Sequence, residues 1–578
     1  MDMRGLRSAY LYQWLAHCKS VLLDSRYRAA DRKARDEFRT FVTQYGGAGL
    51  AHDVRSGGGR IALIDSGSYL PFAKIEALVI KAFHLAGFDT AVVGNRRMDF
   101  MRYAQLAGNR RFLDAGEFGG VGHEAWAQRQ AEALRDLDGW LALTFEGVHV
   151  GRFVVAVAMR LERRGRLDFA DAGVRALLAR ALASSVRHVV GLREVLKRVR
   201  PSCILVMDRG YAGHGEIFDL ALQSGIDVIT WHLGHRPGRL VFKRYSRANE
   251  RAHPFSLSDE SWQRLRALPW SVALGRAIRQ EIFDCYSKEE WFAVVGTQFD
   301  KRVLSREAAR ARLGLDARRK VAVVFPHILW DGSFFFGEDL FDDYTHWLKE
   351  TLLAAGENDR IQWVVKLHPA HLVKARQKSD VARPDELEII NQCFERVPDH
   401  IKIVPPDTEL STYSLFQVAD YTITVRGTVG IESALFGIPV VTAGTGRYDR
   451  LGFTVDSSTR EAYLATLGTL EGIPPLTPAQ IELAERYAYG VFVCRPLRLS
   501  SVTLEFERDA IATPRLRIAP RSRRDWEEAP DMRRLAAWLA AGRGEDLFDL
   551  SETATGVVEP PPVEARPAVG TRAMSSAG

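Results

Sequence analysis

WVVKLHP at residues 363–369 and YTITVRGTVGIESALFG at residues 421–437 share one form, an apolar, β-branched run that leads directly into a polar turn. Such runs are typical of the strands of a buried parallel sheet. In an open parallel sheet, ligands bind just beyond the carboxyl ends of the strands. Both turns are therefore expected at one edge of the same sheet, and we predict that together they form the pocket for an activated, phosphate-bearing donor.

Residues 316–500 continue this pattern of short apolar runs separated by helical segments. The expected strands are Val321–Phe325, Gln362–Leu367, Ile401–Val404, Tyr421–Val425 and Pro439–Thr442. A helix at Pro478–Tyr489 follows the last of them, and another is expected near Asp531–Ala541. Strands that alternate with helices of this length indicate a doubly wound parallel sheet.

Residues 56–255 carry an earlier series of the same kind. The expected strands are Ile61–Ile64, Thr90–Val93, Cys203–Met207 and Val228–Trp231. A long helical region, about 174–199, precedes the third strand. The turn after that strand, residues 208–215, contains three glycines, so its backbone can approach a ligand closely.

The sequence therefore predicts an α/β protein with two Rossmann-like domains that face a cleft. Its 578 residues exceed what one ordinary hydrophobic core holds. The predicted parts are an N-terminal helical extension (1–55), a first Rossmann-like domain for the acceptor (56–255), a helical connection (256–315), a second Rossmann-like domain for the donor (316–500), a closing segment with a helix (501–550) and a tail (551–578). The tail has three consecutive prolines and no hydrophobic periodicity, so we expect it to be disordered.

Composition and cysteine usage indicate a folded chain in a reducing compartment. Hydrophobic residues make up 46% of the chain and charged residues 26%, as in soluble globular proteins. The five cysteines are odd in number, far apart and without the spacing of metal ligands. The sequence shows no secretory signal pattern and no apolar run long enough for a membrane-spanning helix, so we expect a cytoplasmic location.

The net charge of +7 is a small excess spread over 79 basic and 72 acidic residues. No nucleic-acid-binding motif accompanies it, and we expect no nucleic-acid partner. A basic cluster is formed by Arg515, Arg517, Arg521, Arg523 and Arg524. This cluster either contacts an anionic membrane surface, which would place the protein at the inner face of the cell membrane, or is an ordinary solvated surface.

The segment 427–437 is expected to begin a helix directly after a strand. The unpaired N–H groups of such a helix start attract anions, and Arg426 could add a bidentate contact to a phosphate. Gly427 and Gly430 have no side chain that would block the ligand. Thr428 and Glu432 lie four residues apart on one helix face, where Glu432 can accept hydrogen bonds from ribose hydroxyls; the alternative is a solvated helix residue.

Lys366, His368 and Pro369 form the second half of this predicted pocket. Pro369 disfavours helical geometry at His368 and fixes a kinked exit from the strand. The lysine amine and the imidazole would then face the same crevice, where both can donate to phosphate. Two further loops, residues 325–332 and 444–448 with Tyr448, follow strands of the same sheet; each is either part of the site or an ordinary polar loop.

These motifs resemble those of a known family. KLHP at 366–369 followed by TVRGTVGIESALFGIPVVTAG at 424–444 looks like the transferases of bacterial capsule and surface polysaccharide biosynthesis, GT-B glycosyltransferases that include the Kdo transferases. FPHILWDG at 325–332 and LGHRPGRLVFKRY at 233–245 are similar to stretches of related polysaccharide proteins. The His-Pro turn also recurs in several bacterial sialyltransferases.

The resemblance implies that the His-Pro turn and the helix start hold the nucleotide phosphate. It assigns this role to His368, Pro369, Thr428 and Glu432. Where the family has a Ser-Ser or Ser-Thr pair, this chain has Gly427-Thr428, so the nucleotide stays open among CMP, UDP, GDP and CDP.

The implied function is glycosyl transfer from a nucleotide-activated sugar to a glycan or glycolipid acceptor, in the synthesis of a capsular or other cell-surface polysaccharide. The sugar donor is a substrate, and no cofactor is expected. Further partners would be other polysaccharide assembly proteins. The alternatives are a nucleotide-sugar epimerase of the same fold and a non-catalytic scaffold subunit of an assembly complex.

Such a transferase must stabilise the leaving nucleotide and activate the acceptor hydroxyl. We expect Lys366, His368 and Arg426 to serve the leaving group. No carboxylate pair typical of a divalent-metal site is evident, which favours metal-independent chemistry. The catalytic base is expected among four residues at strand ends of the first domain: Asp65, Asp208, His214 and Glu216. Each of them could instead be structural, Asp65 as a turn cap and Glu216 as a helix start.

Overall fold

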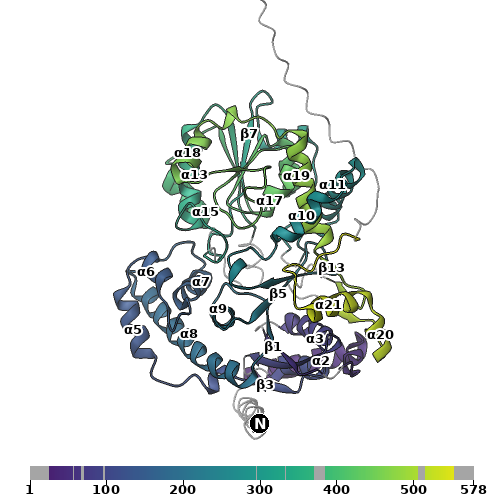
Figure 1. The fold of residues 1–578 in the computed structure, drawn as a ribbon. Helices are drawn as coiled ribbons and strands as arrows, with labels where there is room; N and C mark the ends of the chain where they lie inside the picture. The colour runs from purple at the N-terminus through teal and green to yellow at the C-terminus, as the bar shows by residue number, and fades with distance from the viewer. Residues whose placement is uncertain are drawn as a thin grey trace, which may run out of the picture.

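The computed structural model describes residues 25–55, 58–66, 70–94, 98–293, 296–331, 334–369, 385–505 and 515–551. These residues form two lobes, each built on one β-sheet (Figure 1). Residues 1–24 of the predicted N-terminal helical extension and nearly all of the predicted disordered tail lie outside the described residues.

The first lobe contains a seven-stranded sheet. Its strands, in spatial order, are β13 (Leu497–Arg498), β6 (Arg239–Tyr245), β5 (Asp227–Leu233), β4 (Cys203–Val206), β1 (Arg60–Ser66), β2 (Phe88–Gly94) and β3 (Arg111–Leu113). Neighbouring strands from β5 to β3 are parallel, whereas β6 and β13 run antiparallel at one edge. All four predicted strands are confirmed.

Helices cover both faces of this first sheet. They are α2 (Ser25–Gln44), α3 (Leu70–Leu85), α4 (Met98–Leu106), α5 (Glu124–Ala133), α6 (Leu137–Ala142), α7 (Val150–Glu162), α8 (Ala172–Val199) and α9 (Gly215–Gln223). Alternate residues of β1 enter different cores: Ala62 and Ile64 pack with α3 and α4, and Leu63 packs with α7, α8 and α9. This period of two is what a strand buried on both faces requires.

The second lobe contains a six-stranded sheet in which all the strands are parallel. The order is β12 (Val455–Asp456), β11 (Val440–Thr442), β10 (Tyr421–Thr424), β7 (Val321–Val324), β8 (Gln362–Lys366) and β9 (Ile401–Val404). Its helices are α12 (Arg306–Leu313), α13 (Tyr344–Glu357), α15 (Asp385–Cys393), α16 (Thr412–Val418), α17 (Thr428–Ala434), α18 (Arg460–Gly468) and α19 (Pro478–Tyr489). All five predicted strands are confirmed, and with them the class of two Rossmann-like domains.

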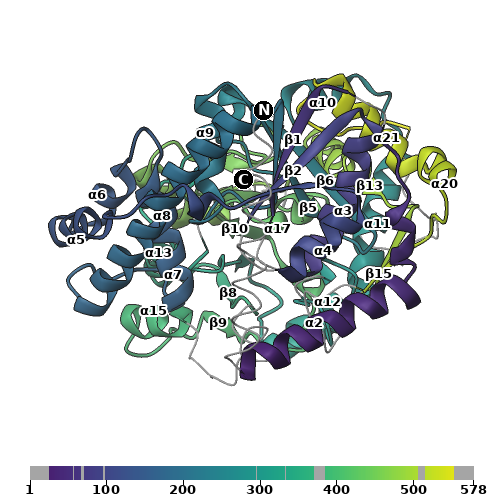
Figure 2. The same cartoon turned by 90° about the horizontal axis from the view of Figure 1, so that it is seen from below.

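Two helices, α10 (Asp259–Ala267) and α11 (Val272–Ser287), connect the lobes. After α19 the chain returns to the first lobe, where it adds β13, the hairpin β14 (Val502–Glu505) and β15 (Arg515–Ile518), and the helices α20 (Arg523–Glu528) and α21 (Pro530–Ala541). Figure 2 shows α21 beside α3. Trp526, Met532 and Leu535 are buried in the same core as α3. The predicted domain boundaries stay a prediction, but this return path is a structural fact.

Strand β6 was not predicted as a strand, because LVFKRY reads as a basic segment. In the structure Lys243 is only 1% exposed, and its Nζ lies 3.0 Å from Oδ1 of Asp546. Nη2 of Arg495 lies 3.3 Å from the same oxygen, and the Ser258 N–H donates to Oδ2 at 2.7 Å. A buried charge needs such partners. They come from residues up to 303 positions away, which a local pattern cannot reveal.

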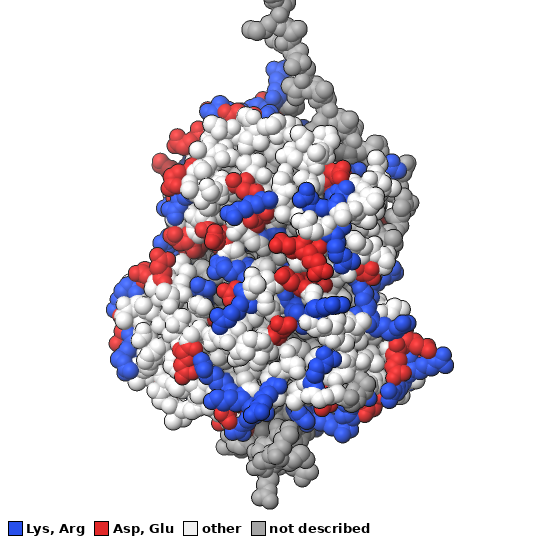
Figure 3. Space-filling model, viewed as in Figure 1, with Lys and Arg blue, Asp and Glu red and all other residues white. Residues whose placement is uncertain are grey.

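Charges of both signs are interspersed over the visible faces of both lobes (Figure 3). In the predicted basic cluster, Arg523 pairs with Glu527 at 2.6 Å and Arg524 with Glu528 at 2.7 Å. Within the part of the chain that the structure describes, no helix is both long and apolar enough to cross a bilayer. The four cysteines in that part are all free.

Candidate functional site

A cavity of about 580 Å³ lies between the two domains, at the carboxyl ends of β7, β8 and β10. Seven of the eight residues predicted to bind the donor line it: Lys366, His368, Pro369, Arg426, Gly427, Thr428 and Glu432. The first domain contributes Arg160, His253 and Phe255 to the opposite wall. The two strand-end turns thus meet at one site, as the strand pattern indicated.

Lys366 is the last residue of β8 and is 7% exposed. Its Nζ donates to the carbonyl oxygen of Leu367 at 2.9 Å. Burial, together with the nearby charge of Lys301, lowers the pKa of Lys366 to about 7. The amine can therefore take up a proton when an anion enters the cavity, and His368 lies beside it on the same wall.

His327 follows β7 and joins the same site, which the sequence had left open between function and an ordinary loop. Its ring stacks on Tyr344, with centroids 4.5 Å apart. Nε2 accepts from the backbone N–H of Arg426 at 3.2 Å, so the neutral ring carries its proton on Nδ1. Burial and the charges of Arg426, His368 and Arg447 lower the pKa of His327 to about 3. His327 is thus an uncharged support for the Arg426 turn.

Arg426 is held by the loop that faces it. Its guanidinium donates to the carbonyl oxygens of Phe336 and Glu338 and forms an ion pair with Asp339. Arg426 lines the cavity, but these bonds occupy the two terminal nitrogens of its guanidinium, which we expected to bind a phosphate bidentately.

Arg447 lies in the loop after β11 and was not among the predicted donor-binding residues. Its Nη1 donates to the carbonyl oxygen of Arg426 at 3.1 Å. Its Nε is buried and, among the described residues, has no hydrogen-bond partner. A buried N–H without a partner is costly, and Arg447 lines the cavity. A ligand anion would satisfy this donor.

Helix α17 has seven residues and is shorter than the predicted segment 427–437. So short a helix adds little to anion binding, and the cationic side chains of the cavity carry most of the charge. Gly430 does not make room for a ligand: a Cβ there would lie 2.1 Å from the hydroxyl of Tyr448. Tyr448 is 2% exposed, donates to the carbonyl oxygen of Gly427 at 2.7 Å and does not line the cavity. It supports the turn from behind.

Glu432 is fully buried and is not a solvated helix residue. The hydroxyl of Tyr286, from the connecting helix α11, donates to Oε2 of Glu432. Burial raises the pKa of Glu432 to about 7, against the opposing effects of Tyr286, Thr428 and Arg447. A carboxyl group that changes charge near neutral pH therefore lies one helical turn from the start of α17.

An aromatic wall completes the cavity, and sequence reasoning did not find it. It consists of Phe255, Tyr286, Trp291, Phe292, Phe325, Trp330, Phe336 and Tyr344. Flat apolar surfaces of this kind can stack on a nucleobase. Beside them Gln298 donates to Oγ1 of Thr412 at 3.3 Å, and its Oε1 is buried without a partner among the described residues. Trp291, Phe292 and Gln298 come from the connection between the domains, where no periodic pattern marks them.

The four predicted catalytic residues of the first domain lie together but do not line the cavity. Nδ1 of His214 lies 2.6 Å from Oδ2 of Asp65. Burial opposes the charged imidazole, yet Asp65, Asp208 and Glu216 outweigh it and raise the pKa of His214 to about 9. The ring is thus protonated at neutral pH, and it must lose that proton before it can serve as a base.

Glu216 and Asp208 hold the turn that carries His214. Glu216 is fully buried, accepts from the hydroxyl of Ser185 and accepts from the Gly213 N–H at 2.7 Å. Asp208 accepts from the Gly210 N–H at 2.9 Å. These contacts are structural. The same turn reaches the cavity through Tyr211, whose hydroxyl donates to the cavity residue Asp331.

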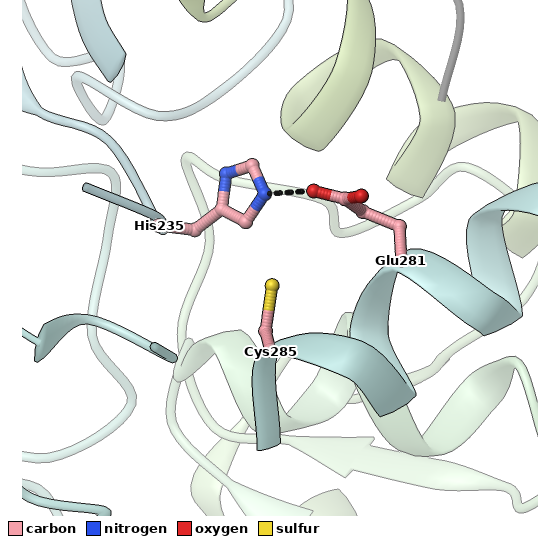
Figure 4. A group of neighbouring side chains, drawn as sticks. All are labelled: His235, Glu281 and Cys285. Atoms are coloured by element: carbon pink, nitrogen blue, oxygen red, sulfur yellow. Dashed lines mark hydrogen bonds and ion pairs between the residues drawn. The ribbon is translucent and has the colours of Figure 1, made fainter. Parts of the chain in front are cut away.

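One group of possible metal ligands occurs among the described residues, and it lies outside the cavity. It consists of His235, Glu281 and Cys285, all buried (Figure 4). The cavity itself holds no such group within the part of the chain that the structure describes.

Two Rossmann-like domains with a site between them form a GT-B-like architecture. No protein-family model matches the chain, and no curated protein sequence matches it. Among solved structures, it is similar to the β-Kdo 2,4 transferase KpsC of Thermosulfurimonas dismutans, with 12% identity, a TM-score of 0.32, and coverage of 55% of this chain and 84% of that one.

Two further solved structures show a likeness of the same order. The UDP-GlcNAc 2-epimerase of Neisseria meningitidis, bound to UDP-GlcNAc, has 12% identity, a TM-score of 0.24, and coverage of 75% and 95%. The spinosyn rhamnosyltransferase SpnG has 12% identity, a TM-score of 0.26, and coverage of 74% and 95%. Because these values are low, the fold assignment rests on the two sheets themselves.

Proposed function

We propose that this chain is a glycosyltransferase that uses a nucleotide-activated sugar to build a bacterial capsular or other cell-surface polysaccharide. The observation that carries the proposal is the convergence of Lys366, His368, Thr428 and Glu432 in one cavity between two Rossmann-like domains. These residues belong to the motifs that resemble the polysaccharide transferases.

The chemistry of the cavity supports a nucleotide as the leaving group. Arg447 and, when protonated, Lys366 would provide positive charge for a phosphate, and His368 can donate a hydrogen bond to it; electrostatic stabilisation of this kind is usually the largest catalytic term. Glu432 is suited to the ribose hydroxyls. The aromatic wall with Gln298 offers a stacking surface and an amide for the base. The donor is a substrate, and we propose that transfer needs neither a cofactor nor added Mg²⁺ or Mn²⁺.

The acceptor would enter from the first domain, where His214 and Asp65 form a hydrogen-bonded pair. We propose that the base comes from the turn that carries His214 and that reaches the cavity through the contact of Tyr211 with Asp331: His214 would take the hydroxyl proton after losing its own to solvent, and Asp65 would orient the ring. Glu216 and Asp208 then act as positioning residues. The acceptor is a glycan or glycolipid, and other polysaccharide assembly proteins and the inner membrane surface are further proposed partners.

The test begins with a thermal-shift screen against CMP, UDP, GDP and CDP, because a ligand that binds only the folded state raises the melting temperature. One nucleotide is expected to bind, and His368→Ala and Glu432→Ala should weaken it while the chain stays folded. The matching nucleotide sugars are then incubated with and without glycan acceptors. Turnover of the donor alone would instead indicate an epimerase, and binding of no nucleotide would indicate a scaffold.

A further inference from the structure

A second group of reactive side chains lies beside the connection between the domains. His235 follows β5 in the turn before β6, and Glu281 and Cys285 lie four residues apart, on one face of α11. They are 2%, 3% and 0% exposed. One ligand atom of each residue lies within 4.8 Å of the other two. An imidazole, a carboxylate and a thiol thus lie close together in the protein interior.

Figure 4 shows that the three side chains converge. The imidazole of His235 faces the carboxylate of Glu281, with Nε2 2.9 Å from Oε1, and Sγ of Cys285 points toward this pair. The His235 ring is fixed by Trp291 and Phe492, whose centroids lie 5.7 and 5.2 Å from it. The ligand atoms therefore need only small shifts to bind one ion.

Neighbouring charges match a divalent cation. Nη1 of Arg236 donates to Oε2 of Glu281 at 2.8 Å, which leaves Oε1 for the ion, and Nη2 of Arg236 lies 2.6 Å from Oε2 of Glu290. Arg236 and Glu290 cancel each other. A neutral imidazole, the Glu281 carboxylate and a Cys285 thiolate together carry two negative charges. A divalent ion would balance the two negative charges of these three ligands.

Hydrogen bonds within this region account for the burial of the polar side chains of His235, Glu281 and Arg236. They do not account for the burial of the Cys285 thiol. Within the described residues, the thiol of Cys285 has no hydrogen-bond partner. Zn²⁺ is the cation that accepts sulfur, nitrogen and carboxylate ligands together, usually in tetrahedral geometry. We propose that His235, Glu281 and Cys285 bind one Zn²⁺ ion, with water at the fourth position.

Binding has a simple proton balance. The Cys285 thiol releases one proton to solvent as the Sγ–Zn²⁺ bond forms, and His235 exchanges its hydrogen bond to Glu281 for a bond from Nε2 to the ion. Before binding, the neutral imidazole donates from Nε2 to the Glu281 carboxylate, so its single proton moves to Nδ1 through solvent as Nε2 takes up the ion, with no net change in the number of protons on His235. No electron moves, and no co-reactant is needed.

The site would stiffen one wall of the interdomain cavity. Cys285 directly precedes Tyr286, which donates to Glu432, and the Phe292 N–H donates to the carbonyl oxygen of His235 at 2.8 Å. Tyr286 and Phe292 both line the cavity. An ion bound here would thus hold α11 and the turn before β6 together behind the cavity. The inference concerns folding and metal content and does not depend on sugar transfer.

The experiment uses the full chain without an affinity tag, purified with a phosphine reductant. Its zinc content is measured by mass spectrometry, and the chelator-treated chain is titrated with Co²⁺. We expect one equivalent of Co²⁺ to produce the near-ultraviolet absorption of a cobalt–thiolate bond, and Zn²⁺ to displace it. Added Zn²⁺ should also raise the melting temperature. A wild-type chain that neither contains nor takes up an ion overturns the proposal without any variant.

Variants then locate the ion. Cys285→Ser should lose the cobalt–thiolate absorption and the thermal shift by Zn²⁺, and Glu281→Gln should weaken both. Cys203→Ser is the matched control, because Cys203 is also a free, buried cysteine (3% exposed) but lies on β4, and it should keep both signals. Absorption that persists in Cys285→Ser would overturn the assignment. Since no step measures nucleotide binding or transfer, failure here leaves the proposed function untouched.

Discussion

The phenolic hydroxyl of Tyr286 donates a hydrogen bond to the carboxylate of Glu432, although 146 residues separate them in the chain. Tyr286 belongs to α11, which connects the domains, and Glu432 belongs to α17 beside the donor cavity. Tyr286 also stacks on Trp291, with centroids 5.2 Å apart. The connection between the domains is therefore part of the cavity wall.

The raised pKa of Glu432 predicts a pH dependence of stability. Because its pKa rises from 4.5 to about 7 on folding, the folded chain binds the proton more tightly, and stability falls as the pH rises from 4.5 to 7. The loss is at most about 3 kcal/mol, at 1.36 kcal/mol per pKa unit. Glu432→Gln should remove this contribution to the decrease in the free energy of unfolding, as measured by urea unfolding at several pH values. Glu505→Gln, at an exposed strand position, is the control; equal pH dependence in all three chains would contradict the prediction.

The pair of His214 and Asp65 predicts an imidazole that stays charged at neutral pH. The charged form stabilises the folded chain below pH 6.5, and this contribution is lost as the pH rises through about 9. Asp65→Asn should shift the titration of His214 toward its ordinary pKa, as followed by histidine-selective NMR. Asp219→Asn removes the partner of His149 instead, at 2.9 Å, and should leave His214 unchanged. A neutral His214 at pH 7 in the wild type would contradict the raised pKa of this imidazole.

Arg447 is predicted to bind the donor phosphate. Its buried Nε lacks a partner among the described residues, so loss of the guanidinium should remove one charge-assisted hydrogen bond. Such bonds contribute about 1.5–3 kcal/mol, hence Arg447→Lys should weaken nucleotide binding by about 10- to 100-fold, measured by calorimetry. Arg396→Ala is the control, because Arg396 is exposed and pairs with the exposed Asp399. Equal affinity in the two variants would remove Arg447 from the site.

Substitution by alanine at two helical glycines of the second domain should have different effects on the free energy of unfolding. A Cβ at Gly430 would lie 2.1 Å from the hydroxyl of Tyr448, whereas nothing lies within 4 Å of a Cβ at Gly468. Gly430→Ala should therefore lower the free energy of unfolding by about 1–3 kcal/mol, as overpacking does. Gly468→Ala should be neutral or should stabilise the chain by up to about 1 kcal/mol. Both values follow from urea unfolding, and a neutral Gly430→Ala would show that Tyr448 is not packed there.

Asp546 neutralises two cations that are almost completely buried. Lys243 and Arg495 are 1% and 0% exposed, and both contact its Oδ1. Asp546→Ala should cost about 3–5 kcal/mol, because it removes the carboxylate that contacts both buried charges and leaves Lys243 with Glu545 at 3.8 Å. Asp399→Ala, at an exposed position that pairs with the exposed Arg396, should change stability little. Calorimetric melting of both variants measures the difference.

The sheets could be predicted from the sequence because their strands are apolar, β-branched runs that are buried on both faces. All nine predicted strands were confirmed on this basis. Strand β6 escaped prediction, since Lys243 and Arg244 make it look exposed, while Asp546, the partner of Lys243, lies 303 residues further along the chain. A local sequence pattern therefore identifies a buried strand only when none of its buried side chains is charged and paired with a residue far away in the sequence.

The candidate site was predictable where it follows strands and not elsewhere. Lys366, His368 and Thr428 stand at strand ends, and the structure brings them together. Trp291 and Gln298 belong to an irregular connection, so nothing in their spacing points to a cavity. Gly430 was expected to admit a ligand but makes room for Tyr448, because a glycine alone does not reveal what approaches it.

The return of the chain after α19 has a consequence for synthesis. Strand β13 and helix α21 complete the sheet and core of the first lobe, although they are made last. The second sheet is continuous in sequence, from Val321 to Asp456, and can close as soon as it leaves the ribosome. In the first lobe, the apolar side of α3 that packs against α21 therefore stays uncovered until Leu535 and Leu539 of α21 have been synthesised. The lobes are therefore finished in the opposite order to that in which they are begun.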